Sequence, residues 1–317
     1  MSRIGIARKL RRLAPLSYVT ARPSAEFDVG RKITLSPGYF PTNPSFVDTD
    51  FGRLVCIRGV NYRLADDLSL TPVFTAGDRY HSINRFVLLD GHEVVRALPE
   101  LDAAFEGAED VRLFAFDGAL WGACSRPISG TGLNCEMVLM KIKGDLRGAK
   151  AMPLASPYGF RQEKNWSPFV HEGAVHFIYS FEPLVVLRCD TTSGRLEFID
   201  PQWAQYPSSL FTFLMCGSAS GVQAGNRQLF IVHRRSVRLP RLRRIYVHRC
   251  ATLGPSLRAL SFGPYFVVGG PEIQFVAGMG LSDEVVRLSY GRMDRFAVLA
   301  EFDRRHFLGT FVPHAGD

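Results

Sequence analysis

The chain has 317 residues, of which 46% are hydrophobic and 21% are charged, and its formal net charge is +8. This composition is typical of a globular protein with a full apolar core, which excludes extensive disorder away from the termini. No apolar run approaches the ~20 residues of a membrane span, and the N-terminus lacks the continuous apolar core of a signal peptide. We therefore expect a cytoplasmic protein.

The six cysteines are widely spaced, with no C-x-x-C pair, and most lie in apolar runs such as "LVCI" and "WGAC". Cysteines in such runs behave as small buried hydrophobic residues. We expect a reducing compartment, no disulfide and no zinc site. Nothing in the sequence implies another metal or a cofactor.

Residues 1–25 are predicted to form a separate basic segment. Its first dozen positions hold five arginines and lysines, and the apolar residues Ile6, Leu10 and Leu13 recur among them at helical spacing. Such a stretch could lie on an anionic membrane surface, at the inner face of the membrane. A frayed basic arm without a partner is the alternative.

From residue 26 onward the pattern is almost entirely β, with short apolar runs separated by Gly, Asp, Asn and Pro turns. Five runs align as a weak repeat that starts at Leu54, Leu120, His176, Leu229 and Val286, with separations of 66, 56, 53 and 57 residues. A repeat of this length predicts radially arranged blades. We therefore predict an all-β fold, a single five-bladed β-propeller over residues 26–317, with a β-sandwich as the alternative.

Charged residues gather where two successive repeats enter their apolar strands, in "GAEDVRLF" and in "EKNWSPF". Because the innermost strands of a propeller surround a central channel, we expect these two clusters to meet in one pocket, beside the arginines of "IRGVNYRL". A hydrolase usually needs two carboxylates. One carboxylate among cations suits glycosyl transfer that involves phosphate, since arginine and lysine bind phosphate and a single acid can transfer the proton.

Three stretches carry a resemblance to a known family. "GAEDVRLFAFDG" resembles a G-x-E-D-P-R-x-x-x-x-D-G element, "EKNWSPF" resembles an E-K-N element, and "LSYGRMDRFAVLAEF" is similar to an S-Y-G-x-x-D element. Together they resemble the mannoside phosphorylases of glycoside hydrolase family 130 and the related β-1,2-mannosyltransferases, and they span roughly residues 54–302. The chain departs from the pattern at Val111, which replaces a proline, and at "CGSASG", which replaces a Gly-Thr-Pro element.

The resemblance implies an inverting glycosyltransferase or glycoside phosphorylase that acts on β-mannoside-like linkages. Its partners would be a sugar-phosphate or nucleotide-sugar and a glycan acceptor. Asp110 would be the general acid, working through a sugar hydroxyl, while Lys164 and either Arg58 or Arg63 would bind phosphate. The remaining residues implied to border the pocket are Glu109, Arg112, Glu163, Asn165, His233, Tyr290 and Asp294. A glycoside hydrolase and a non-catalytic glycan-binding propeller are the alternatives.

The stretch "HRRSVRLPRLRRIYVHR", from His233 to Arg249, is predicted to form a long basic hairpin. It could receive an anionic glycan, a nucleotide diphosphate or a lipid phosphate, and a solvated loop is the alternative. Nucleic acid is not an expected partner, because neither basic stretch contains a recognised binding motif.

Overall fold

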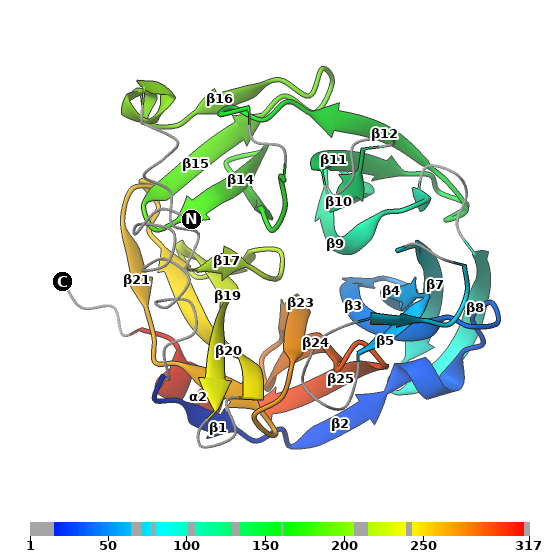
Figure 1. The fold of residues 1–317 in the computed structure, drawn as a ribbon. Helices are drawn as coiled ribbons and strands as arrows, with labels where there is room; N and C mark the ends of the chain where they lie inside the picture. The colour runs from blue at the N-terminus through cyan, green and yellow to red at the C-terminus, as the bar shows by residue number, and fades with distance from the viewer. Residues whose placement is uncertain are drawn as a thin grey trace, which may run out of the picture.

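The computed structural model describes residues 16–64, 72–77, 80–100, 105–128, 134–159, 162–205, 215–238 and 243–313. Strands dominate these ranges, and the helical elements among them are η1 (Val29–Lys32), η3 (Pro201–Gln205) and α2 (Arg304–Phe311). The sheets are arranged radially around a centre, with β3, β9, β17 and β23 on the inner side (Figure 1). The all-β propeller arrangement predicted from the sequence is confirmed.

Four sheets are regular four-stranded blades. The first blade contains β3 (Phe40–Thr49), β4 (Gly52–Val60), β7 (Ser82–Asp90) and β8 (Glu93–Glu100). The second contains β9 (Glu109–Phe116), β10 (Ala119–Pro127), β11 (Cys135–Ile142) and β12 (Ala149–Leu154). The third contains β13 (Ser167–His171), β14 (Ala174–Phe181), β15 (Leu184–Cys189) and β16 (Leu196–Phe198), and the closing blade contains β2 (Ala25–Asp28), β23 (Gln274–Leu281), β24 (Val285–Arg292) and β25 (Phe296–Asp303).

A seven-stranded sheet stands between the third blade and the closing blade, where the sequence predicted a fifth regular blade. Its strands are β1 (Val19–Ala21), β17 (Cys216–Gly217), β18 (Val222–Ala224), β19 (Arg227–Arg238), β20 (Arg243–Leu253), β21 (Leu260–Phe262) and β22 (Phe266–Val268). The structure therefore has four regular blades rather than five. The seven-stranded sheet departs from the pattern because two short strands, β17 and β18, pair with the same long strand β19, and because β1 and β22 extend its other side.

The five aligned runs of the sequence repeat fall at the same place in each sheet. They correspond to β4, β10, β14, β19 and β24, each of which lies next to the innermost strand of its sheet. Both faces of these strands are covered by neighbouring sheets, as in β14, where seven of the eight residues are buried. Burial on both faces explains why they appear as continuous apolar runs rather than as alternating ones.

Tight turns connect the inner strands to these second strands. Asp117 and Gly118 join β9 to β10, and Glu172 and Gly173 join β13 to β14, and all four residues have positive φ. Two-residue hairpin turns of this kind require positive φ at both positions, which glycine and aspartate tolerate. A separate two-stranded hairpin, β5 (Tyr62–Leu64) and β6 (Pro72–Phe74), follows β4.

The N-terminal strands close the ring. β2 pairs antiparallel with β25, so a strand from the start of the chain completes the closing blade. β1 pairs parallel with β22, from Val19 opposite Phe266 to Ala21 opposite Val268. Residues 19–21, which fall within the segment predicted to be separate, are part of a sheet. Residues 1–15, which include the basic stretch expected to contact a membrane, lie outside the described residues.

No helix in the described part of the chain is both long enough and apolar enough to span a membrane.

Candidate active site

Three inner-strand segments share a backbone distortion that positions polar side chains. Asn43, Asp110 and Asn165 have φ values of 42°, 54° and 65° and occupy the second position of "TNPS", "EDVR" and "KNWS". The pairing of β3 with β4 shifts around Asn43, and the pairing of β9 with β10 shifts around Asp110. Asn and Asp tolerate this left-handed conformation better than most residues, and a bulge redirects the side chain of the residue that forms it.

Asp110 is held mainly by residues of the neighbouring blade. Its Oδ1 accepts a hydrogen bond of 2.7 Å from Asn43 Nδ2 and an ion-paired hydrogen bond of 2.8 Å from Arg58 Nη1. Arg58 Nη2 lies 3.2 Å from Glu109 Oε1, and Arg58 Nε donates to Ser82 Oγ at 2.8 Å. The side chain of Asp110 is 16% exposed. The carboxylate is thus fixed in position and still reachable.

Asn43, Arg58, Ser82, Glu109 and Asp110 form what we call the Asp110 cluster. The charges of this cluster keep Asp110 ionised. Burial by itself would raise the pKa of Asp110, but the positive charges of Arg58 and Arg112 and the hydrogen bonds from Asn43 and Arg58 outweigh burial and lower it below its ordinary value. Burial alone would likewise lower the pKa of Arg58, but Glu109 and Asp110 raise it above its ordinary value. Asp110 is therefore a carboxylate that can accept a proton.

Arg112 is fully buried and contacts residues of several sheets. Its Nε donates to the carbonyl of Ser218, its Nη1 donates to Asp110 O at 3.3 Å, and its Nη2 donates to Asn165 Oδ1 at 3.1 Å. The guanidinium also lies 5.7 Å from the ring centroid of Phe275. Arg112 thus connects the second blade, the third blade, the seven-stranded sheet and the closing blade, and it presents no exposed surface to a phosphate.

Asp294 is a second carboxylate near Arg58. It has a φ of 50° and follows the end of β24, and its Oδ2 accepts a hydrogen bond of 3.1 Å from Tyr62 Oη. Burial raises the pKa of Asp294 above its ordinary value, although the charge of Arg58 and the Tyr62 hydrogen bond act in the opposite direction. The charge of Arg58 therefore acts on both Asp110 and Asp294, but the pKa values of the two carboxyl groups are shifted in opposite directions.

His233 lies beside this cluster as a neutral ring. Its Nδ1 lies 2.8 Å from Ser218 Oγ, and its ring contacts Phe275 edge-on with centroids 5.0 Å apart. Burial, together with the charges of His248, Arg235 and Arg112, holds the pKa of His233 well below its ordinary value. His233 is therefore a buried, neutral ring that adds no positive charge to the cluster.

The three polar residues of "EKNWSPF" point to three different environments. Glu163 is buried and accepts hydrogen bonds from Trp166 Nε1 at 3.1 Å and from Tyr179 Oη at 3.3 Å, so it anchors an aromatic core. Lys164 is exposed, and Asn165 contacts Arg112. The structure therefore brings Asn165 to the cluster, leaves Lys164 at the surface and directs Glu163 into the core.

Two other candidate residues lie apart from the Asp110 cluster. Tyr290 is buried in an apolar core and donates a hydrogen bond of 2.8 Å to Glu26 in the outermost strand of the closing blade. Arg63 is exposed, and its guanidinium lies 4.5 Å from the ring centroid of Phe40. Of the two candidate arginines, the structure therefore favours Arg58 over Arg63 as the partner of Asp110.

Sequence reasoning missed Asn43, Ser82 and Tyr62, which contact Asp110, Arg58 and Asp294. The signal for Asn43 was present, because "TNPS" can be aligned with "EDVR" and "KNWS", with an Asn or Asp at the second position of each. Tyr62 and Ser82 had no comparable signal, since neither belongs to a repeated motif.

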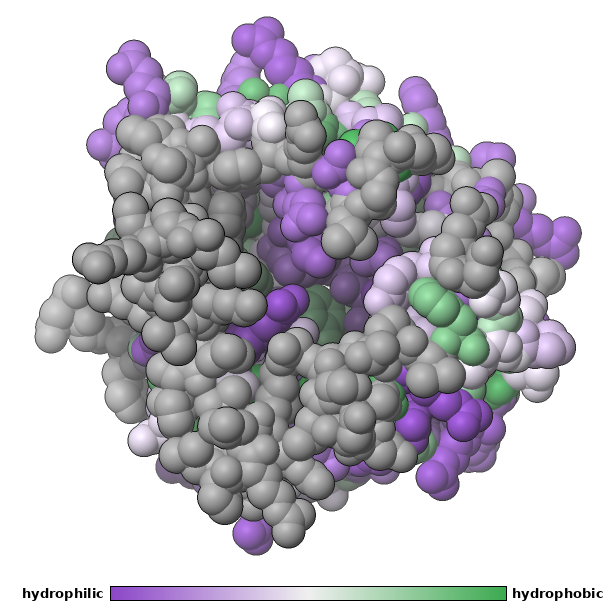
Figure 2. All heavy atoms as spheres, in the orientation of Figure 1, coloured by the Kyte–Doolittle hydropathy of each residue, from purple (hydrophilic) through white to green (hydrophobic). Residues whose placement is uncertain are grey.

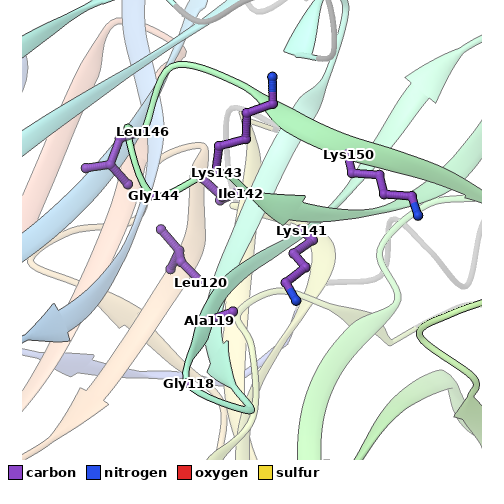
Figure 3. A pocket seen from close by; sticks show the side chains of 9 residues that line it. All are labelled: Gly118, Ala119, Leu120, Lys141, Ile142, Lys143, Gly144, Leu146 and Lys150. Atoms are coloured by element: carbon purple, nitrogen blue, oxygen red, sulfur yellow. The ribbon is translucent and has the colours of Figure 1, made fainter.

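Figure 2 shows that the viewed face is hollowed at the centre of the ring and that hydrophilic side chains line this hollow. A separate hollow of about 450 Å³ lies on the second blade and is lined by Lys141, Lys143 and Lys150. The three ammonium groups of these lysines do not converge (Figure 3), and none of the residues that hold Asp110 lines this hollow. Within the described ranges, no three His, Cys, Asp or Glu side chains are grouped as a metal site.

Comparisons with known proteins give the same architecture. No family model matches the chain. The structure of β-1,2-mannobiose phosphorylase from Listeria innocua matches with a TM-score of 0.60 and 11% identity, over 89% of this chain and 96% of that one. A GDP-Man-dependent mannosyltransferase from Leishmania mexicana matches with a TM-score of 0.57 and 14% identity, over 100% of this chain and 99% of that one.

Similarity in sequence is confined to part of the chain. Beta-mannosyltransferase 1 of Komagataella phaffii is 30% identical over 136 residues, which cover 35% of this chain and 19% of that protein. The chain thus spans about a fifth of the length of the curated relatives that it matches first. The structural likeness shows a shared fold, and the sequence similarity is to a beta-mannosyltransferase over 35% of this chain.

Proposed function

We propose that this protein is an inverting glycosyltransferase or glycoside phosphorylase that forms or cleaves β-mannoside-like linkages, with Asp110 as its catalytic residue. The observation that carries the proposal is the reachable carboxylate of Asp110, which Arg58 and Asn43 hold ionised on the inner side of the propeller. The similar proteins named above include both a phosphorylase and a mannosyltransferase.

Because Asp110 is ionised, we propose that it is the general base in the direction of transfer. An acceptor hydroxyl attacks the anomeric carbon of the donor sugar on the face opposite the leaving phosphate oxygen, which inverts the configuration. Asp110 accepts the proton of that hydroxyl, directly or through a sugar hydroxyl, and the bond to the phosphate oxygen breaks. In the reverse, phosphorolytic direction the protonated Asp110 is the general acid, since the same group returns the same proton.

A glycoside hydrolase is the second candidate, and Asp294 is the observation that favours it. Two carboxyl groups with pKa values shifted in opposite directions form a typical acid and base pair. Here the pKa of Asp294 is raised and the pKa of Asp110 is lowered. Inverting hydrolases place such groups ~6.5–9.5 Å apart, with a water between them. In this reading Asp294 protonates the leaving oxygen and Asp110 activates the water.

One set of assays separates these reactions. The protein is incubated with β-mannoside oligosaccharides alone, with oligosaccharide and inorganic phosphate, and with an acceptor plus mannose 1-phosphate or GDP-mannose. We expect turnover only when phosphate or an activated donor is present, and we expect Asp110→Asn to lower kcat by roughly 10²–10⁴-fold with substrate binding retained. Release of free mannose without phosphate would favour the hydrolase, and full activity of Asp110→Asn would refute the role of Asp110.

We also propose that the seven-stranded sheet acts as the fifth blade. This is supported by its place between the third blade and the closing blade and by the position of β19, which matches that of the second strand in each regular blade. Its contribution to the centre is Ser218, which contacts both Arg112 and His233.

A further inference from the structure

The hairpin β19–β20 extends further than the corresponding strands of the closing blade. β19 has 12 residues and β20 has 11, whereas β23, β24 and β25 have 8 each. Their pairing continues from Gln228 opposite Leu253 to Arg238 opposite Arg243, while the inner strand β17 pairs with β19 only at Val232 and His233. The hairpin therefore continues beyond the inner strand β17. Its extended part begins at His233, whose ring lies beside the Asp110 cluster.

Three side chains of this hairpin form a stack. The rings of His233 and Tyr246 are nearly parallel, at 16°, with centroids 5.4 Å apart. The guanidinium of Arg235 lies 5.9 Å from the centroid of Tyr246. His233 is buried, Tyr246 is half-buried and Arg235 is exposed, so the stack leads from the interior to the surface.

The inner end of the stack is connected to the Asp110 cluster by direct contacts. His233 contacts the ring of Phe275, and Phe275 contacts the guanidinium of Arg112, which donates a hydrogen bond to the carbonyl oxygen of Asp110. Arg235 follows His233 by two residues on the same face of β19, which places it about 7 Å further along the strand. A group bound at Arg235 is thus separated from a sugar at Asp110 by several ring contacts.

The charges of Arg58 and Arg235 are balanced differently. Arg58 is paired with both Glu109 and Asp110, which leaves it little attraction for a further anion. Within the described ranges, no carboxylate lies within ion-pair distance of Arg235. A planar guanidinium supported by an aromatic ring can bind a diphosphate through two parallel hydrogen bonds or stack on a base.

We propose that the hairpin β19–β20 forms a subsite for the nucleoside diphosphate part of a glycosyl donor, with Arg235 as its contact residue and Tyr246 and His233 as its support. The inference rests on the proposed transfer at Asp110 and specifies the donor. A sugar 1-phosphate bound beside Asp110 is too short to reach Arg235 past Phe275 and His233, whereas a nucleoside diphosphate extends beyond its sugar by a second phosphate and a nucleoside.

Isothermal titration calorimetry with GDP, UDP, ADP and inorganic phosphate tests this subsite on the full chain. We expect Arg235→Ala to raise the Kd of the preferred nucleoside diphosphate by about 10-fold or more, since hydrogen bonds to charged groups contribute that much. Arg235→Lys should recover only part of the affinity, because it keeps the charge but loses the planar fork. Arg195→Ala, at an exposed arginine paired with Glu197 on the third blade, is the matched control and should bind as wild type.

The outcomes separate this inference from the proposed function. The inference is overturned if wild-type protein binds none of the three nucleotides, or if Arg235→Ala binds them as tightly as wild type does. Turnover of mannose 1-phosphate that depends on Asp110, without nucleotide binding, would overturn the subsite and leave the proposed function intact. Nucleotide binding that depends on Arg235, with no turnover of any donor, would support the subsite and contradict the proposed function.

Discussion

Replacing Arg112 with methionine tests whether this residue stabilises the fold through internal hydrogen bonds or binds phosphate. The substitution keeps a long apolar side chain but removes four hydrogen bonds, to the carbonyls of Asp110, Gly217 and Ser218 and to Asn165 Oδ1. It also removes one of the two positive charges that lower the pKa of Asp110. Because Gly217 and Ser218 are buried, water cannot easily replace the donors lost at their carbonyls.

The expected cost follows from the burial of Arg112. Leaving a buried hydrogen-bond acceptor without its donor typically lowers the free energy of unfolding by about 1–3 kcal/mol, which is a substantial share of the ~5–15 kcal/mol of a whole domain. Adding the four bonds separately would overestimate the cost, because they belong to one side chain. With an m value of ~3 kcal/mol per molar urea, the midpoint of unfolding should fall by about 0.3–1 M.

The assay is urea unfolding followed by tryptophan fluorescence, and Arg195→Met is the control. Arg195 is 76% exposed and forms one surface ion pair, so the same substitution there should change the free energy of unfolding by about 1 kcal/mol or less. If Arg112→Met lowers the free energy of unfolding by less than about 1 kcal/mol, the structural role of Arg112 is refuted. If that variant kept its stability but lost affinity for phosphate, the role implied by the sequence motif would be correct instead.

Three further substitutions address the remaining residues of the cluster. Asn43→Asp places a second carboxylate beside Asp110 and raises the pKa of the pair. Because the activity of an ionised base falls as pH drops through its pKa, we expect the acid limb of the pH–rate profile for transfer to move to higher pH. An unmoved acid limb would contradict the contact between Asn43 and Asp110. Gly291→Ala adds a Cβ that overlaps Asn43 Oδ1, so displacement of Asn43 should lower kcat by up to about 100-fold, whereas unchanged kcat would show that Asn43 does not position Asp110. Glu163→Gln should lower the free energy of unfolding by about 1–3 kcal/mol through its buried contact with Trp166, with kcat near that of wild type; a large loss of kcat at unchanged stability would restore the pocket role predicted for Glu163.

The sequence predicted the ring of blades because its strongest signal comes from strands buried on both faces. The aligned runs mark the strand next to the inner strand in every sheet, including β19 of the irregular sheet. The sequence did not predict the seven-stranded sheet, because that departure depends on which strand pairs with β19 and on β1 arriving from residues 19–21. Pairing between distant segments is not encoded in the local pattern.

Side-chain direction was the harder part of the site to predict. In "EKNW" the residues Glu163, Lys164 and Asn165 are adjacent, and an ordinary strand would alternate them between two faces. The positive φ of Asn165 breaks this alternation, so that Glu163 reaches Trp166 in the core while Asn165 reaches Arg112. A family motif names the residues that occur together, but the backbone conformation decides which of them share a pocket.

The closing-blade motif "SYGRMD" shows how residues outside the pocket hold the carboxylate of Asp110 in place. Ser289 donates a hydrogen bond to the carbonyl of Pro44, and Gly291 leaves the space that Asn43 occupies. Tyr290, between them, points to the opposite side and donates a hydrogen bond to Glu26 in the outermost strand of the same blade. The motif thus fixes the bulge of the first blade from behind, and Asn43, placed by that bulge, donates a hydrogen bond to Asp110 of the second blade. The first blade, the second blade and the closing blade must therefore be correctly placed relative to one another for Asn43 to position Asp110.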